Sequence, residues 1–157
     1  MLKALFLTTF VATGALSTAA YAAGDAAAGE DTFKRCKSCH GIANGDEVIV
    51  RGGRTGPNLF GVIGKAAGTV EGFRYGDDIV AAGEAGLVWT EETVAEYAAD
   101  PTAYLRTFLG DDSARAKMTF KLRSGGEDVA AYLASLAPAP EMEAESEGDE
   151  AESSDTN

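Results

Sequence analysis

The chain has 157 residues, about the length of one domain, with 13 basic side chains, 25 acidic side chains and a formal net charge of −12. This balance argues against a general nucleic-acid binder, which needs a basic surface for phosphate contacts. Two cysteines are too few for a disulfide framework, and one histidine is too few for a multi-histidine metal cluster. A Ser-His-Asp catalytic set would have to use His40.

Residues 1–22 are typical of a secretory signal peptide. Lys3 gives a positive start, residues 4–15 form an apolar run, and Ala20-Tyr21-Ala22 supplies an A-x-A cleavage site. The alternative is an uncleaved membrane anchor, but the apolar run is shorter than the ~20 residues that span a bilayer. We therefore expect an exported chain that begins near Ala23 and has no stable membrane insertion after cleavage.

The next part of the chain predicts an all-α domain with no convincing strands. Thr90 and Pro101 mark two helix starts, and Gly110 marks a stop. The expected helices are residues 26–35, 77–82, 91–99 and 101–109, and a terminal helix opened by the capping box Ser124-Gly125-Gly126-Glu127. Residues 41–88 predict long glycine-rich loops, which are uncommon inside compact domains. We expect a group other than side chains to fill the centre.

We expect residues 137–157 to form a disordered acidic tail. This stretch holds eight acidic side chains and no basic one, and Met142 is its only apolar side chain apart from alanines. Such a composition cannot bury enough surface to offset the entropy cost of ordering. The compact domain is therefore predicted to span residues 23–136.

The motif Cys36-Lys37-Ser38-Cys39-His40 matches the C-x-x-C-H pattern of covalent haem attachment. Its two thiols are spaced to form thioethers with both vinyl groups of one porphyrin, and the histidine that follows binds the iron. A thioredoxin-like redox pair would need a strand-helix-strand pattern, a zinc site would need a fourth ligand, and a plain disulfide would give His40 no role. The motif predicts one covalently attached haem c per chain.

Met118 is the candidate for the second axial ligand. Of the three methionines, Met1 would leave with the signal peptide and Met142 lies in the acidic tail. A single methionine is often core filler, but the haem motif favours Met118 as a ligand. Two protein ligands leave no open position on iron, and His/Met ligation raises the reduction potential. These ligands predict a high-potential one-electron carrier rather than an enzyme.

Basic side chains are concentrated in two windows beside the candidate ligands. Residues 34–37 hold three bases and residues 115–123 hold four, with no acid in either window. Charge runs are often only solvated faces, but this placement favours a docking face whose attraction for acidic partners weakens with salt. The expected members are Lys34, Arg35, Lys37, Arg115, Lys117, Lys121 and Arg123.

Six motifs in this order resemble class I cytochrome c, and the long connections, signal peptide and acidic tail resemble its bacterial cytochrome c2 subgroup. The motifs are Cys36 to His40, Gly56-Pro57-Asn58-Leu59, Gly72-Phe73-Arg74-Tyr75, Trp89-Thr90-Glu91-Glu92, Glu96-Tyr97 and Lys117-Met118-Thr119-Phe120. The resemblance implies helices and long loops wrapped around one covalent haem c. Lys65, Ile79 and Ala116 depart from the arginine, asparagine and threonine of many members.

The resemblance also implies roles for residues around the haem. The Pro57 carbonyl would accept the second imidazole N–H of His40, Tyr75 and Trp89 would hydrogen-bond a propionate, and Tyr97 would lie near the methionine sulfur. Without the family, Pro57 predicts only a turn, and Trp89 and Tyr97 could be only core aromatics.

The implied function is that of a soluble, monomeric periplasmic shuttle. Its partners would be a cytochrome bc complex as electron donor and a terminal oxidase or a photosynthetic reaction centre as acceptor. Two alternatives stay open at this point. One is a haem enzyme or gas sensor in which Met118 is displaced, and the other is a membrane-tethered electron relay that retains residues 1–22.

Overall fold

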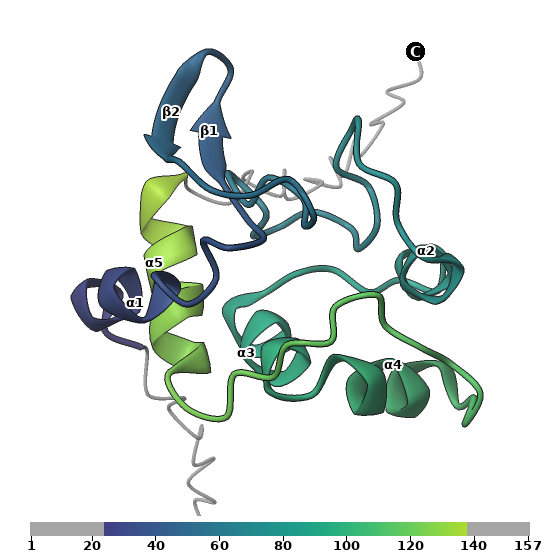
Figure 1. Cartoon of the computed structure of the whole chain (residues 1–157). Helices are drawn as coiled ribbons and strands as arrows, with labels where there is room; N and C mark the ends of the chain where they lie inside the picture. The colour runs from purple at the N-terminus through teal and green to yellow at the C-terminus, as the bar shows by residue number, and fades with distance from the viewer. Residues whose placement is uncertain (1–23, 138–157) are drawn as a thin grey trace, which may run out of the picture.

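A computed structural model describes residues 24–137, and helices are the main regular structure in this part of the chain (Figure 1). The elements are α1 (Ala26–Phe33), β1 (Ile42–Asn44), β2 (Glu47–Val50), α2 (Asp77–Glu84), α3 (Glu91–Ala99), α4 (Pro101–Leu109) and α5 (Gly126–Leu136). The predicted helical class is confirmed. None of the helices in this part is long and apolar enough to cross a membrane. The predicted signal peptide, residues 1–22, lies outside the described residues.

Local capping explains where three helices begin. The Asp25 side chain accepts hydrogen bonds from the first turn of α1, and Asp100 accepts one from Ala103 at the start of α4. Thr90 and Thr93 exchange side-chain and backbone bonds at the start of α3. Such bonds satisfy N–H groups that have no partner within the helix. The predicted starts of α3 and α4 and the stop at Gly110 are confirmed.

The structure contradicts the prediction that the chain has no strands. Ile42–Asn44 and Glu47–Val50 form an antiparallel hairpin. Gly45 has a φ of +58° at the first position of the two-residue turn, which is the glycine position of a type II′ hairpin. The Asn44-Gly45-Asp46 turn signal was present in the sequence, but the strands are too short for their alternating pattern to stand out.

Three helix boundaries also differ from the prediction. α1 ends two residues earlier than expected and α2 runs two residues longer. The predicted capping box at Ser124 is wrong, because Gly125 takes a left-handed conformation and the N-cap position of α5 without a side-chain bond. Instead, the Asp128 carboxylate accepts a hydrogen bond of 2.8 Å from Asp25 N, which joins the start of α5 to α1.

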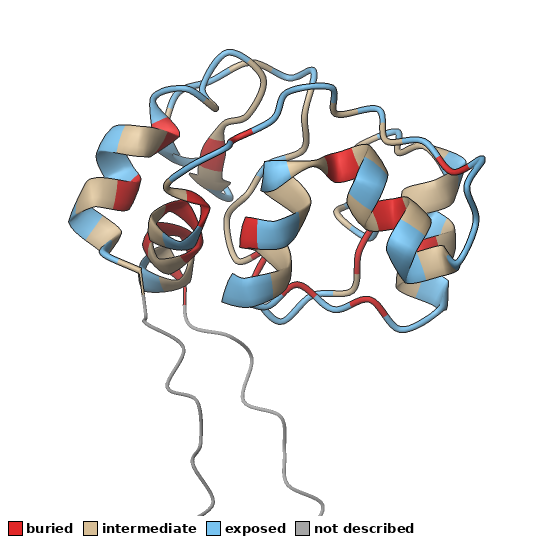
Figure 2. Cartoon of the chain, turned by 90° about the horizontal axis from the view of Figure 1, so that it is seen from below, coloured by how far each residue is buried: buried red, intermediate tan, exposed pale blue. Residues whose placement is uncertain are grey.

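The packing centre of the described chain lies along α5. This helix packs against both α1 and α3, while α4 packs against α3 and α2 (Figure 1). Gly29 permits the close approach of α1, because a side chain there would collide with the Asp128 backbone. Phe33 and Tyr132 bury their rings at this crossing, with centroids 5.7 Å apart. The buried residues shown in red in Figure 2 mark α5 as the most buried helix.

The segment between β2 and α2 forms the long loops that the sequence predicts. Residues 51–76 contain no helix or strand. A bridge between Ala66 and Val88 and backbone hydrogen bonds, including one of 2.9 Å from Trp89 N to the Lys65 carbonyl, tie them to the chain before α3. Ala137, the last described residue, is buried, and a side chain at Gly61 would contact it. The rest of the predicted acidic tail lies outside the described residues.

Candidate functional site

The Cys36–His40 motif forms a tight turn directly after α1. Cys36 N donates to the Phe33 carbonyl at 2.8 Å, so the turn continues from the helix. Cys39 N and His40 N both donate to the Cys36 carbonyl, at 3.0 and 2.9 Å. Both thiols are free in the described structure and are half-buried. The backbone therefore holds two thiols and an imidazole in one turn.

The two thiols have different environments. Burial raises the pKa of the Cys36 thiol. Hydrogen bonds from the Thr55 and Ser38 hydroxyls lower the pKa of the Cys39 thiol, because they stabilise its thiolate. Cys39 is therefore the more readily ionised of the pair.

The His40 ring has one nitrogen committed to the protein. His40 Nδ1 lies 2.9 Å from the Pro57 carbonyl oxygen, and because a carbonyl can only accept, Nδ1 carries the hydrogen. Burial lowers the pKa of His40 and so favours the neutral ring. In a neutral ring protonated at Nδ1, the lone pair of Nε2 is available to a metal.

Three glycines let the loop before Pro57 lie against the haem-attachment motif. Gly53 N donates to the Lys37 carbonyl and Gly56 N donates to the Cys39 carbonyl, both at 2.9 Å. A side chain at Gly52 or Gly53 would collide with the motif's backbone, and one at Gly56 would overlap the His40 ring. These roles of Gly52 and Gly53 were not predicted, although adjacent glycines soon after a ligand motif are a usable signal of close backbone approach.

Met118 lies on the irregular segment between α4 and α5, where it is half-buried. The preceding residue, Lys117, donates from Nζ to the carbonyls of Arg74 and Tyr75 at 3.0 and 2.7 Å. These contacts bring the Met118 segment beside Tyr75, although the two residues are 43 positions apart in the chain. Two of the predicted site residues, Met118 and Tyr75, therefore lie on adjoining segments of the chain.

The other predicted aromatic residues form one group. Trp89 is 8% exposed, and its ring makes an edge contact with Tyr97 at a centroid distance of 5.1 Å. Tyr97 in turn contacts Tyr104 at 6.0 Å. Burial, together with the nearby Tyr75, raises the pKa of Tyr97 to about 12, so its hydroxyl remains a hydrogen-bond donor at neutral pH.

The two candidate ligand segments meet at the surface. The Arg35 guanidinium lies over the Phe120 ring, 5.6 Å from its centroid, as a cation–π contact. Arg35 directly precedes Cys36, and Phe120 follows Met118 by two residues. The donor set fits a haem c, since it combines two free thiols, an oriented imidazole and a thioether on the adjoining segment.

All seven side chains of the predicted docking face are exposed, but they are not equally free. Lys34 pairs with Asp31 and Lys121 pairs with Asp100, each at 2.5 Å. Lys117 bonds to the two carbonyls described above. Within residues 24–137, three of these basic side chains make no hydrogen bond, ion pair or cation–π contact. These are Lys37, Arg115 and Arg123.

Comparison with known proteins gives a consistent result, although no protein-family model matches the chain. The chain is 62% identical over 117 residues to cytochrome c-551 of Roseobacter denitrificans, a match that covers 74% of this chain and 84% of that protein. It is 56% identical over 115 residues to cytochrome c2 of Rhodobacter capsulatus, covering 73% and 84%. The solved structure of the Rhodobacter capsulatus cytochrome c2 superposes with a TM-score of 0.71 at 55% identity, covering 72% of this chain and 98% of that one.

These relatives confirm the family resemblance inferred from the six motifs. They also confirm the predicted cofactor and the prediction that the protein is not an enzyme. The chain belongs to the cytochrome c2 group of class I cytochromes c, and it is an electron carrier with one covalently bound haem c.

Proposed function

We propose that this chain is a periplasmic one-electron shuttle, with His40 and Met118 as the two axial ligands of its haem iron. Cys36 and Cys39 attach the haem through thioethers. The observation that carries the proposal is the hydrogen bond of 2.9 Å between His40 Nδ1 and the Pro57 carbonyl. It orients the ring and leaves Nε2 as the nitrogen that can bind iron.

The chemistry follows from this ligation. A bound haem c supplies a ferric–ferrous couple that takes up and releases one electron. With His40 and Met118 both bound to iron, no site would remain there for oxygen, peroxide or a substrate. A neutral imidazole and a thioether favour the ferrous state over harder ligands, which raises the reduction potential.

Three further side chains act at the edge of the haem and beside Met118. In the proposed site, Tyr75 and Trp89 would donate hydrogen bonds to a propionate, and Tyr97 would donate toward the methionine sulfur. Burial raises the pKa of both tyrosines, which supports their role as donors at neutral pH. The low exposure of Trp89 and its edge contact with Tyr97 support a site from which water is largely excluded.

Residues 1–22 direct export and are then removed, which places the monomeric protein in the periplasm. In this proposal the haem domain runs from about Ala23 to residue 136, and the acidic tail comprises residues 137–157. The short positive start, apolar run and A-x-A site support this processing. Export is consistent with the assignment of the two cysteines to a covalent haem.

The exposed bases near the two ligand segments form a docking face for acidic surfaces on redox partners. The Arg35–Phe120 contact supports a single face, because it joins the two basic windows. Lys37 and Arg123 are its strongest members, since Lys34 and Lys121 pair with acidic side chains and the Arg115 backbone binds the Asp78 carboxylate at 2.8 Å. The partners are a cytochrome bc complex as donor and a terminal oxidase or photosynthetic reaction centre as acceptor.

Replacement of Met118 tests its assignment as a ligand. We expect Met118→Ala to retain the covalent haem but to change the visible spectrum and lower the reduction potential. The decrease should be on the order of 100 mV, since axial ligands tune haem potentials over ~0.8 V. Met142→Ala is the matched control and should behave like the unchanged protein. An unaltered spectrum and potential in Met118→Ala would reject Met118 as a ligand.

Replacement of Gly56 tests whether close packing holds the His40 ring. A methyl group at Gly56 would overlap the ring, so Gly56→Ala should displace the ring or the loop and break the Nδ1–Pro57 bond. We expect a loss of about 1–3 kcal/mol in the free energy of unfolding, as for other overpacked sites. Gly41→Ala is the control, because a methyl group there makes only ordinary contacts. Denaturant unfolding of the two holoproteins compares them, and equal midpoints would contradict the proposed packing role.

Charge reversal tests the docking face. We expect Lys37→Glu combined with Arg123→Glu to slow association with an acidic redox partner roughly tenfold at low ionic strength, and to flatten its salt dependence. Arg51→Glu combined with Lys65→Glu changes the net charge equally, outside the two basic windows, and should have a smaller effect. Stopped-flow measurement of the second-order rate constant tests this. A change in maximal turnover alone, or an equal effect of the control pair, would contradict the docking face.

A further inference from the structure

The backbone around Met118 has few hydrogen bonds of its own. Among residues 24–137, the backbone groups of Met118, Thr119 and Phe120 have no hydrogen-bond partner. Phe120 is 38% exposed, so burial does not hold it strongly. The position of Met118 must therefore depend on contacts made by the residues on either side of it.

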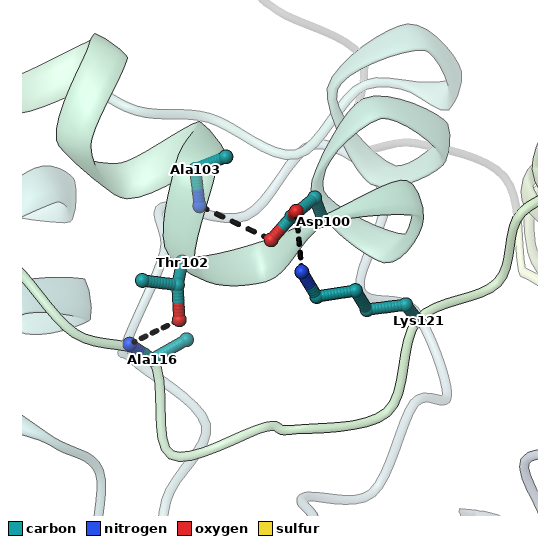
Figure 3. Close-up of polar contacts among 5 residues, drawn as sticks. All are labelled: Asp100, Thr102, Ala103, Ala116 and Lys121. Carbon is teal, nitrogen blue, oxygen red and sulfur yellow. Dashed lines mark hydrogen bonds and ion pairs between the residues drawn. The ribbon is translucent and has the colours of Figure 1, made fainter.

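Before Met118, the chain is held by α4. Ala116 N donates to the Thr102 hydroxyl oxygen at 3.3 Å (Figure 3). Thr102 is the second residue of α4 and is half-buried. Two residues earlier, the buried Ala114 accepts a hydrogen bond of 3.1 Å from Arg106 Nε, also on α4.

After Met118, the chain is held at the junction of α3 and α4. Lys121 Nζ lies 2.5 Å from Asp100 Oδ2, while the other oxygen of the same carboxylate accepts from Ala103 N at 3.2 Å (Figure 3). The hydrogen bond from Lys121 is the main reason why the pKa of Asp100 is lowered, so the carboxylate stays charged to a lower pH than an ordinary aspartate. The neighbouring Leu122 is buried and donates from its backbone to the Ala98 carbonyl at 2.8 Å.

The start of α4 thus contacts the chain two residues before and three residues after Met118. Lys117 also holds this segment, on the side of Tyr75, but it is adjacent to Met118 and belongs to the predicted docking face. Thr102 is distant from Met118 in sequence, and its single hydrogen bond can be removed without a change of side-chain shape. A substitution at Thr102 can therefore test how α4 holds the Met118 segment without changing the contacts of Lys117.

We propose that Asp100 and Thr102 form a clamp, here named the α4 clamp, that keeps Met118 on the haem iron. The inference rests on the proposed function, in which Met118 is an axial ligand. Thr102 is a positioning residue, because it acts through the backbone at Ala116. The α4 clamp controls how readily an external ligand replaces Met118.

The test is the displacement of Met118 by cyanide in the ferric holoprotein. The readout is the rate at which the red charge-transfer absorbance of methionine-bound ferric haem disappears. We expect Thr102→Val to accelerate the displacement about two- to tenfold, as for the loss of one net hydrogen bond. Thr102→Ser keeps the hydroxyl and should restore the original rate. Thr107→Val, at an exposed position on the same helix, should leave the rate unchanged.

A second variant tests the ion pair in the α4 clamp. Asp100→Asn keeps a residue that caps helices well but removes the charge that pairs with Lys121. We expect it to accelerate displacement at low ionic strength, with an effect that shrinks as salt is added. Asp31→Asn breaks a more exposed pair of the same length, with Lys34, and should have no effect on displacement.

The outcomes separate this inference from the proposed function. A displacement rate in Thr102→Val equal to that of the unchanged protein would overturn the α4 clamp, even if denaturant unfolding showed a loss of global stability. Equal acceleration in Thr107→Val would also overturn it. If Met118→Ala itself kept the red absorbance and the original cyanide kinetics, the ligand assignment of the proposed function would fail instead.

Discussion

The hydrogen bond between His40 Nδ1 and the Pro57 carbonyl is the interaction on which the rest of the site depends. It fixes the tautomer and the orientation of the only histidine, which together decide whether Nε2 can bind iron. The bond requires the loop at 51–57 to lie directly against the haem-attachment turn. Gly52, Gly53 and Gly56 permit this approach, because a side chain at each would collide with the turn or the ring.

The two candidate ligands are held in different ways. His40 lies in the same turn as both thiols and is oriented by a loop that follows closely in the chain. Met118 lies on an irregular segment that is positioned by tertiary contacts, from α4 on one side and through Lys117 to the Tyr75 region on the other. The position of His40 therefore depends on local hydrogen bonds. The position of Met118 depends on how α4 and the Tyr75 loop pack, so changes in that packing should affect Met118 more than His40.

Features that depend only on residues close together in the sequence could be predicted from it. The haem-attachment turn at 36–40 is a contiguous motif, and the start of α3 follows from the local cap at Thr90. The hairpin turn at Gly45 was equally local, but its strands were too short to be recognised. The contact between Thr102 and Ala116 could not be predicted, because it joins residues 14 positions apart whose meeting depends on how α4 packs. A local motif thus indicated His40 and elimination among the methionines indicated Met118 as candidate ligands, but neither predicts how the Met118 segment is held.

We propose that two protein side chains, His40 and Met118, together occupy both axial positions of the haem iron. The most direct measurement is the visible spectrum of the ferrous protein, recorded at neutral pH before and after addition of carbon monoxide. We predict an unchanged spectrum, because His40 and Met118 leave no position for the gas. Rapid formation of a carbon monoxide adduct would contradict the claim.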